Sequence, residues 1–416
     1  MLFPFIRTME ILIAAARFPR KLSFLAAACL ATLPGFVASV ANAGDEPPAA
    51  ASNEKKAGVL NDPNFFPLAV WLQNPANAAR YKAAGINLYV GLWRGPTDEQ
   101  LASLKQQGLH VICSPNDVGL AHKLDPTIVA WMHGDEPDNA QRIRGQKGYG
   151  PPIEPSKIIA DYKRIKQADP SRPVMLNLGQ GVAWDQYIGR GVRRNHPEDY
   201  AQYIKGSDIV SFDIYPACHQ HADVAGKLWF VADGVTRLRK WAGDERTVWN
   251  VIECTHISNP NAKATPHQVK AEVWMSLVRG SRGIVYFSHQ FEPTFIEAGL
   301  LADAEMLAAV TSINTQIQDL AAVLNSPSIA SGWTIESANA DVPVEAMVKR
   351  HGGETYIFAV CLRGQPTTAT IKFADRALGQ QAIALGEDRT VAISGGQFQD
   401  SFQPWDVHLY RIPARP

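Results

Sequence analysis

The chain has 416 residues, of which 46% are hydrophobic and 19% are charged, and its 40 basic residues balance 40 acidic ones. This composition is typical of a globular protein and excludes a disordered or disulfide-dense chain. A net charge of zero without a long basic run gives no electrostatic reason to expect nucleic acid as a partner. The length suits two or three domains of roughly 100 to 200 residues each.

The first 43 residues have the features of a secretory signal. Basic residues precede an apolar run over 22–40, and the small residues Ala-Asn-Ala at 41–43 supply a cleavage site. We therefore predict a signal peptide at residues 1–43, no stable membrane insertion once it is removed, and an exported protein in the periplasm or outside the cell.

Strand and helix signals alternate after a flexible lead-in at residues 44–58. Alternation of this kind implies βαβ units and a parallel sheet, and eight strands within about 265 residues match the size of a (β/α)8 barrel. We predict this TIM barrel at residues 59–325. The eight strand-like runs are Phe65 to Leu72, Ile86 to Trp93, His110 to Ser114, Ile128 to Gly134, Val174 to Leu178, Asp208 to Tyr215, Thr247 to Cys254 and Gly283 to Ser288.

Helix ends are also marked in the sequence. Thr97 with Gln100 forms a capping box, as does Thr265 with Gln268, and a last helix is expected from Asp303 to Leu324. The pattern then changes, because short alternating runs separated by turn residues fill residues 328–416. We predict a small all-β domain there, a β-sandwich.

Two carboxylates stand out at strand ends. Active sites of (β/α)8 barrels lie at the C-terminal ends of the strands. Glu136 follows the fourth apolar run and Glu253 ends the seventh. Hydrolysis of a glycosidic bond needs one carboxylic acid to protonate the leaving oxygen and one carboxylate to attack carbon or activate water. The pair therefore points to glycoside hydrolysis, with Arg94 and Tyr215 as candidates for keeping the second carboxylate ionised.

This pattern resembles the clan A glycoside hydrolases, (β/α)8 enzymes whose acid/base Glu follows strand four in an Asn-Glu-Pro-like motif and whose nucleophile Glu ends strand seven. The matching residues are Asp135-Glu136-Pro137 and Glu253, with Tyr215 in the place of a strand-six tyrosine. The resemblance implies a retaining mechanism with Glu136 as acid/base and Glu253 as nucleophile. Asp135 stands where the family usually has an Asn, whose amide donates a hydrogen bond to the sugar 2-hydroxyl group. An ionised carboxylate can only accept hydrogen bonds, so recognition of the sugar at that position is left open.

Further polar and aromatic residues after the strands are candidates for binding an oligosaccharide or polysaccharide. Aromatic rings match the apolar faces of sugars. Asp213 is either a third functional carboxylate or a buried residue that caps a loop. The candidates are Trp93, Arg94, Asn116, Asp135, Asn177, Trp184, Asp213, Tyr215, His256 and His289.

No metal or cofactor is expected. Histidines 219 and 221 form a His-x-His pair, but no second close pair completes a ligand set. Cys218 and Cys254 are the cysteines to test for a disulfide, with free buried thiols as the alternative. Arginines in the long loops 138–155 and 179–199 either meet an acidic sugar substituent or are solvated.

Two other functions fit the same residues. One is a non-catalytic carbohydrate-binding protein that keeps the barrel and its cleft. The other is a transglycosylase or a carbohydrate lyase on the same scaffold. Binding without product would indicate the first, whereas glycosyl transfer or an unsaturated product would indicate the second.

Overall fold

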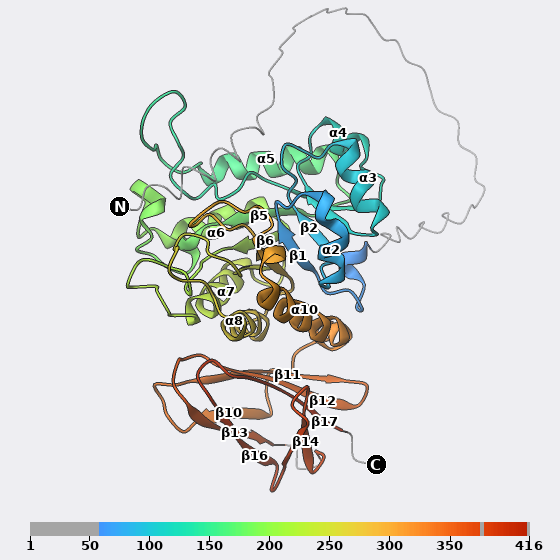
Figure 1. Ribbon diagram of the computed structural model, residues 1–416, viewed down its shortest axis with the longest axis vertical. Coiled ribbons are helices and arrows are strands. Elements are labelled where there is room, and N and C mark those ends of the chain that lie inside the picture. The colour runs from blue at the N-terminus through green and yellow to red at the C-terminus, as the bar shows by residue number, and fades with distance from the viewer. Residues whose placement is uncertain (1–57, 375–377, 414–416) are drawn as a thin grey trace, which may run out of the picture.

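The structure is a computed structural model that describes residues 58–374 and 378–413 (Figure 1). The predicted signal peptide and all but the last residue of the lead-in lie outside the described residues. No helix within those two described ranges combines the length and the apolar character needed to span a membrane.

A parallel barrel forms the first part of the described chain, which confirms the predicted (β/α)8 fold. Its strands follow one another in the order β7-β6-β5-β4-β3-β2-β1-β9-β8. The seventh predicted strand is split at Trp249 into β7 and β8, and a bridge between Asp213 and Val251 joins the two ends of the sheet. The strands are β1 (Leu68–Trp71), β2 (Leu88–Val90), β3 (His110–Cys113), β4 (Ile128–Met132), β5 (Val174–Leu178), β6 (Ile209–Phe212), β7 (Thr247–Val248), β8 (Asn250–Glu253) and β9 (Ile284–Phe287).

Helices surround the barrel and carry the predicted caps. Both capping boxes are present, at Thr97 before α3 and at Thr265 before α8. The last predicted helix is divided near Leu320 into α10 and α11. The α-helices are α2 (Ala78–Ala83), α3 (Asp98–Gln106), α4 (Asp117–Ala121), α5 (Pro155–Ala168), α6 (Tyr200–Tyr203), α7 (Trp229–Ala242), α8 (Pro266–Val278), α9 (Gly299–Ala302), α10 (Ala304–Asp319) and α11 (Ala321–Asn325), and the 3-10 turns are η1 (Val59–Asn61), η2 (Pro75–Asn77), η3 (Gln180–Val182), η4 (Ile188–Arg193), η5 (Pro197–Asp199) and η6 (Ile204–Gly206).

The barrel strands bury side chains on both faces. Ala69 and Trp71 of β1 belong to the cluster that fills the barrel, whereas Leu68 and Val70 belong to the layer under the helices. The same alternation places Met175 of β5 and Ile209 of β6 inside the barrel. It therefore fixes which residues at the strand ends face the mouth.

The C-terminal part is the predicted β-sandwich. Two antiparallel sheets pack over a core of their own, to which Ile357 contributes from one sheet and Phe398 from the other. One sheet has the order β10-β13-β16 and the other the order β11-β12-β17-β14-β15. Their bounds are β10 (Trp333–Ser337), β11 (Val344–His351), β12 (Glu354–Cys361), β13 (Thr367–Phe373), β14 (Gln381–Ala384), β15 (Arg389–Ala392), β16 (Gln397–Phe402) and β17 (Val407–Ile412).

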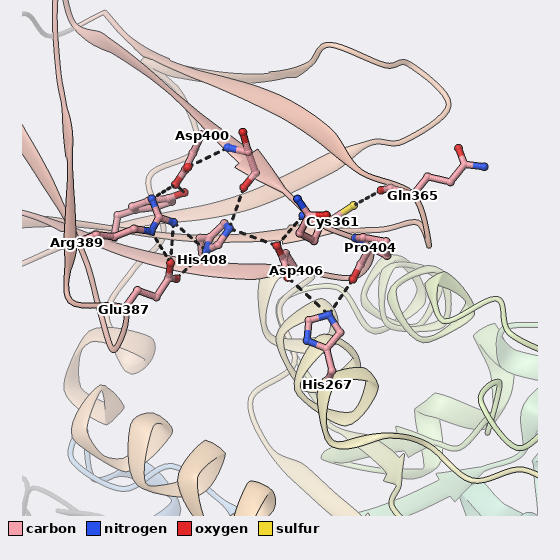
Figure 2. Close-up of polar contacts among 12 residues, drawn as sticks. His267, Cys361, Gln365, Glu387, Arg389, Asp400, Pro404, Asp406 and His408 are labelled. Carbon is pink, nitrogen blue, oxygen red and sulfur yellow. Dashed lines mark hydrogen bonds and ion pairs between the residues drawn. The ribbon is translucent and has the colours of Figure 1, made fainter.

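The sandwich packs against the barrel through α8, and Figure 1 shows β11 and β12 facing the helices α8 and α10. The rings of Trp274 and Phe358 stack with centroids 5.3 Å apart. At the N-terminal end of α8, Nε2 of His267 donates to the carbonyl of Pro404 at 2.8 Å and lies 3.7 Å from Asp406 (Figure 2). Aromatic packing and polar contacts thus join the two domains.

The described cysteines are free. Cys113, Cys218, Cys254 and Cys361 are all buried as thiols. The Cys218–Cys254 disulfide is therefore not formed, and the alternative of free buried thiols describes the structure.

Candidate active site

Carboxyl groups gather at the C-terminal ends of β4, β5 and β6. Asp135 and Glu136 lie in the loop after β4, and Asp213 directly follows β6. Asn177 of β5 lies between them, because its Nδ2 donates to Asp135 Oδ1 at 2.9 Å and lies 3.4 Å from Asp213 Oδ2. Three neighbouring strands thus bring together four of the residues expected at the site.

Strand alternation explains why these side chains converge. Asn177 lies two residues after the inward-facing Met175, and Ser211 and Asp213 continue the inward face that begins at Ile209. Ser211 Oγ donates to Asn177 Oδ1 at 2.7 Å. This bond fixes the orientation of the amide, so that its NH2 group points at the carboxylates.

Glu136 reaches the cluster through an unusual backbone. Its φ is 41°, in the left-handed region that side chains other than glycine seldom occupy. Strain of this kind is commonly found at functional sites. Gly179 faces it, and a Cβ on that residue would lie 2.8 Å from Glu136 Oε1. The glycine therefore leaves room for the carboxyl group of Glu136.

The cluster holds protons more tightly than isolated carboxylates do. Burial, followed by the negative charge of Asp135, raises the pKa of Asp213 to about 8. Burial raises the pKa of Asp135 to about 7, with Asn177 opposing the rise. Burial and then the charges of Asp213 and Asp135 raise the pKa of Glu136 well above its usual value. At neutral pH, therefore, the cluster is partly protonated.

Glu253 lies in a separate buried pair. Its exposed fraction is 0%, and its two oxygens accept from the backbone N–H groups of Ala217 at 2.6 Å and Cys218 at 2.9 Å. The titratable group next to it is Glu272 of α8; apart from this pairing, the carboxyl oxygens of Glu272 have no hydrogen-bond partner among the described residues. Burial raises the pKa of both residues, which means that the pair retains a proton.

Aromatic candidates are more buried than their positions in the sequence suggest. Trp184 is 6% exposed, and its ring packs against His219 and His221 with centroids 5.6 and 4.8 Å away. Tyr215 packs against Phe287 at 5.3 Å, and its hydroxyl group has no hydrogen-bond partner among the described residues. Both side chains line the interior rather than an open surface.

The other predicted residues differ in their surroundings. The Arg94 guanidinium lies 5.5 Å from the centroid of the Trp93 ring, and Arg94 is exposed. His289 is buried and stacks on Phe291, with centroids 6.0 Å apart. His256 Nδ1 lies 3.1 Å from the carbonyl oxygen of Asn259.

Asn116 has a structural contact that its position alone does not reveal. Its Oδ1 accepts from Gly119 N at 2.8 Å, which caps α4, and its Nδ2 donates to the Pro96 carbonyl at 3.0 Å. The same side-chain chemistry suits a helix cap and a sugar hydroxyl, so the sequence does not separate the two roles.

Asp138 is a buried residue of the site region that the sequence reading did not single out. Its Oδ1 accepts from Gly179 N and its Oδ2 from the Tyr200 hydroxyl, each at 2.9 Å. The Arg190 guanidinium lowers the pKa of Asp138, although burial prevails and the net shift is upward. In the sequence, Asp138 was marked as a site residue only by its position two residues after Glu136.

Three arginines of the predicted long loop 179–199 bind other residues of the protein. Arg190 is buried and bonds Asp199 at 2.8 Å, and Arg193 binds the same carboxylate. Arg194 donates to Gln186 at 2.7 Å. These contacts remove the basis for an acidic sugar partner at these three side chains. Among residues 58–374 and 378–413, no three His, Cys, Asp or Glu side chains are placed to hold a metal ion.

Comparison with solved structures identifies the fold. No protein-family model and no curated protein matches the chain. A noncanonic maltogenic alpha-amylase, AmyB from Thermotoga neapolitana, matches with a TM-score of 0.52 and 8% identity, over 85% of this chain and 100% of that one. A single-residue variant of AmyP in complex with maltotriose matches with a TM-score of 0.50 and 11% identity, over 88% and 100% of the two chains.

A third structure, a cyclomaltodextrinase, matches with a TM-score of 0.50 and 8% identity, over 84% of this chain and 78% of that one. At such identities the likeness concerns the fold. It confirms the barrel with a trailing β domain that the resemblance to clan A glycoside hydrolases implies. The chain thus has the (β/α)8 fold of glycoside hydrolases.

Proposed function

We propose that the protein is a glycoside hydrolase that cleaves O-glycosidic bonds of an oligosaccharide or polysaccharide. The observation that carries the proposal is the carboxyl cluster of Glu136, Asp135 and Asp213 at the C-terminal ends of adjacent strands. This end of a (β/α)8 barrel is where active sites occur. Of the three residues, Glu136 and Asp135 keep part of their surface exposed.

Glu136 is proposed as the acid/base. A general acid must hold its proton at the pH of the reaction, and the raised pKa of Glu136 provides this. The protonated carboxyl group gives its proton to the leaving glycosidic oxygen while the bond from that oxygen to the anomeric carbon breaks. The resulting carboxylate then accepts a proton from the water that enters in the second step.

Glu253 is proposed as the nucleophile, in line with the resemblance. Hydrogen bonds from Ala217 N and Cys218 N favour its ionised form, which attacks the anomeric carbon. Because Glu253 is fully covered, the segment that carries these two amides must move aside for a sugar to reach it. Glu136 needs no such movement, because part of its surface is exposed.

The proposed substrate is an uncharged oligosaccharide or polysaccharide. The carboxyl cluster repels anionic sugars, and Arg190, Arg193 and Arg194 are occupied by contacts within the protein. Two of the matching structures are named as an amylase and a complex with maltotriose, which supports trying neutral glucans first. Export, based on residues 1–43, belongs to the same proposal.

The experiment is a screen of neutral oligosaccharides and aryl glycosides with the mature chain and with Glu253→Ala. The variant should lose turnover, and azide, which fits the space left by the side chain, should restore product formation as a glycosyl azide. Full turnover in Glu253→Ala would overturn its role as nucleophile. Binding of oligosaccharides without any product from the unaltered chain would overturn the enzyme and favour a carbohydrate-binding protein.

A further inference from the structure

We propose that Asp213 is a positioning residue that keeps the catalytic proton on Glu136, and that Asn177 holds Asp213 in the place where it does so. The inference rests on the proposed function, because it gives the acid of that reaction its partner. It assigns to Asp213 a role that differs from binding the sugar.

The geometry places Asp213 between a fixed amide and the acid. Its side chain is buried and faces the barrel mouth, with Oδ2 lying 3.4 Å from Asn177 Nδ2. Asn177 is itself buried and is oriented by Ser211 of β6, the strand that Asp213 directly follows. The carboxyl group of Asp213 is in hydrogen-bond contact with that of Glu136. Two carboxyl groups in contact share one proton, because both cannot be ionised at that separation.

Among the neighbours of Glu136, Asp135 also raises its pKa by its charge, but Asp213 is the one in hydrogen-bond contact with it. Asp138, on the same loop as Glu136, has its charge opposed by Arg190. The tyrosines contribute no negative charge near neutral pH, since burial raises the pKa of each. The titratable groups that face Glu136 are Asp135 and Asp138 from its own loop, Asp213 and Tyr215 from the segment at and after the end of β6, and Tyr187 next to η4.

The arrangement also serves the second half of the reaction. When protonated Glu136 gives its proton to the glycosidic oxygen, two carboxyl groups with at most one proton between them remain in contact. Where both are ionised, their repulsion favours return of a proton to Glu136 from the incoming water, while the oxygen of that water bonds to the anomeric carbon and the bond from this carbon to Glu253 breaks. Glu136 thus regains in the second step the proton that it gave up in the first, and Asp213 acts through Glu136 rather than on the sugar.

The test follows the titration of Glu136 with and without its partner. Carbodiimide reacts with protonated carboxyl groups, so labelling at Glu136, distinguished from labelling at Asp135 and Asp138 by fragmentation of the peptide in the mass spectrometer and followed across pH, reports the proton of Glu136 without any substrate. In Asp213→Asn the labelling midpoint should fall by about one pH unit or more. Where turnover is measurable, the alkaline limb of kcat/KM should fall with it. Asp213→Glu keeps the charge and should retain the high midpoint.

Asp223→Asn is the matched control, since Asp223 lies ten residues further along the same connection and is exposed. It should leave the midpoint unchanged. An unchanged labelling midpoint in Asp213→Asn would overturn the inference. If turnover were lost at that unchanged midpoint, Asp213 would have only a structural role. If the unaltered chain shows the high midpoint but hydrolyses no glycoside, the proposed function fails while the proton sharing remains.

Discussion

The carboxyl groups of Glu253 and Glu272 face each other in a fully buried pair between β8 and α8. Backbone amides from the segment after β6 bind only the first of the two. Glu272 is therefore held neutral by burial and by the charge of Glu253, and it bears the proton of the pair.

Stability should consequently fall at alkaline pH. The folded-state pKa of Glu272 lies well above the value of about 4.3 found in an unfolded chain, so the folded protein binds more protons between the two. The stabilising contribution is complete below the unfolded pKa and is lost as the pH rises through the folded pKa. Each unit of the shift corresponds to about 1.4 kcal/mol.

Glu272→Gln should remove this dependence, because the amide can donate to Glu253 and carries no titrating proton. We expect the melting temperature of the variant to decline less between pH 5 and 9 than that of the unaltered chain. Thermal unfolding monitored by circular dichroism measures it. Parallel curves for the two proteins would show that the pair does not share a proton.

Replacing Glu136 by glutamine should lower turnover without loss of stability. A missing general acid costs about 10²- to 10⁴-fold. The loss should be smallest for aryl glycosides whose leaving group departs without protonation. Because the change also removes a carboxyl group from a crowded cluster, the free energy of unfolding should stay level or rise. Equal losses with good and poor leaving groups would exclude Glu136 as the acid.

Gly179→Ala, at the end of the neighbouring strand β5, should impair the same acid. The added Cβ would lie 2.8 Å from Glu136 Oε1 and 2.8 Å from Asn139 Oδ1, so one of the side chains must move. Misplacement by about 1 Å can cost 10²-fold in rate. Gly134→Ala is the control, since its Cβ would meet nothing within 4 Å. Similar kcat values for the two variants would contradict the proposed crowding.

Local patterns were sufficient to predict most of the fold. Capping boxes at Thr97 and Thr265 depend on residues three apart, and strand alternation depends on next neighbours, so both are visible in the sequence. Alternation and strand order also placed Asp135 and Asp213 at one mouth. The break at Trp249 was not predicted, because an apolar run continues through it.

Contacts between distant residues could not be predicted in this way. Glu253 ends an apolar strand, as expected, but its pairing with Glu272 depends on how α8 lies over β8. Asp138 is buried by Tyr200 and Arg190, which are more than fifty residues away in the chain. Asn116 caps α4, a role that competes with ligand binding for the same amide.

The contact between Trp274 of α8 and Phe358 of β12 predicts that the two domains stabilise each other. Both rings are fully buried, and truncating a buried phenylalanine costs about 3 to 5 kcal/mol. Phe358→Ala should therefore lower the temperature at which the barrel loses its structure and its turnover. Phe373→Ala, in the sheet that Figure 1 shows on the far side from the barrel, is partly buried and should lower it less. Calorimetry with parallel activity measurements distinguishes the outcomes: a barrel that keeps its melting temperature in Phe358→Ala would show that it folds independently of the sandwich.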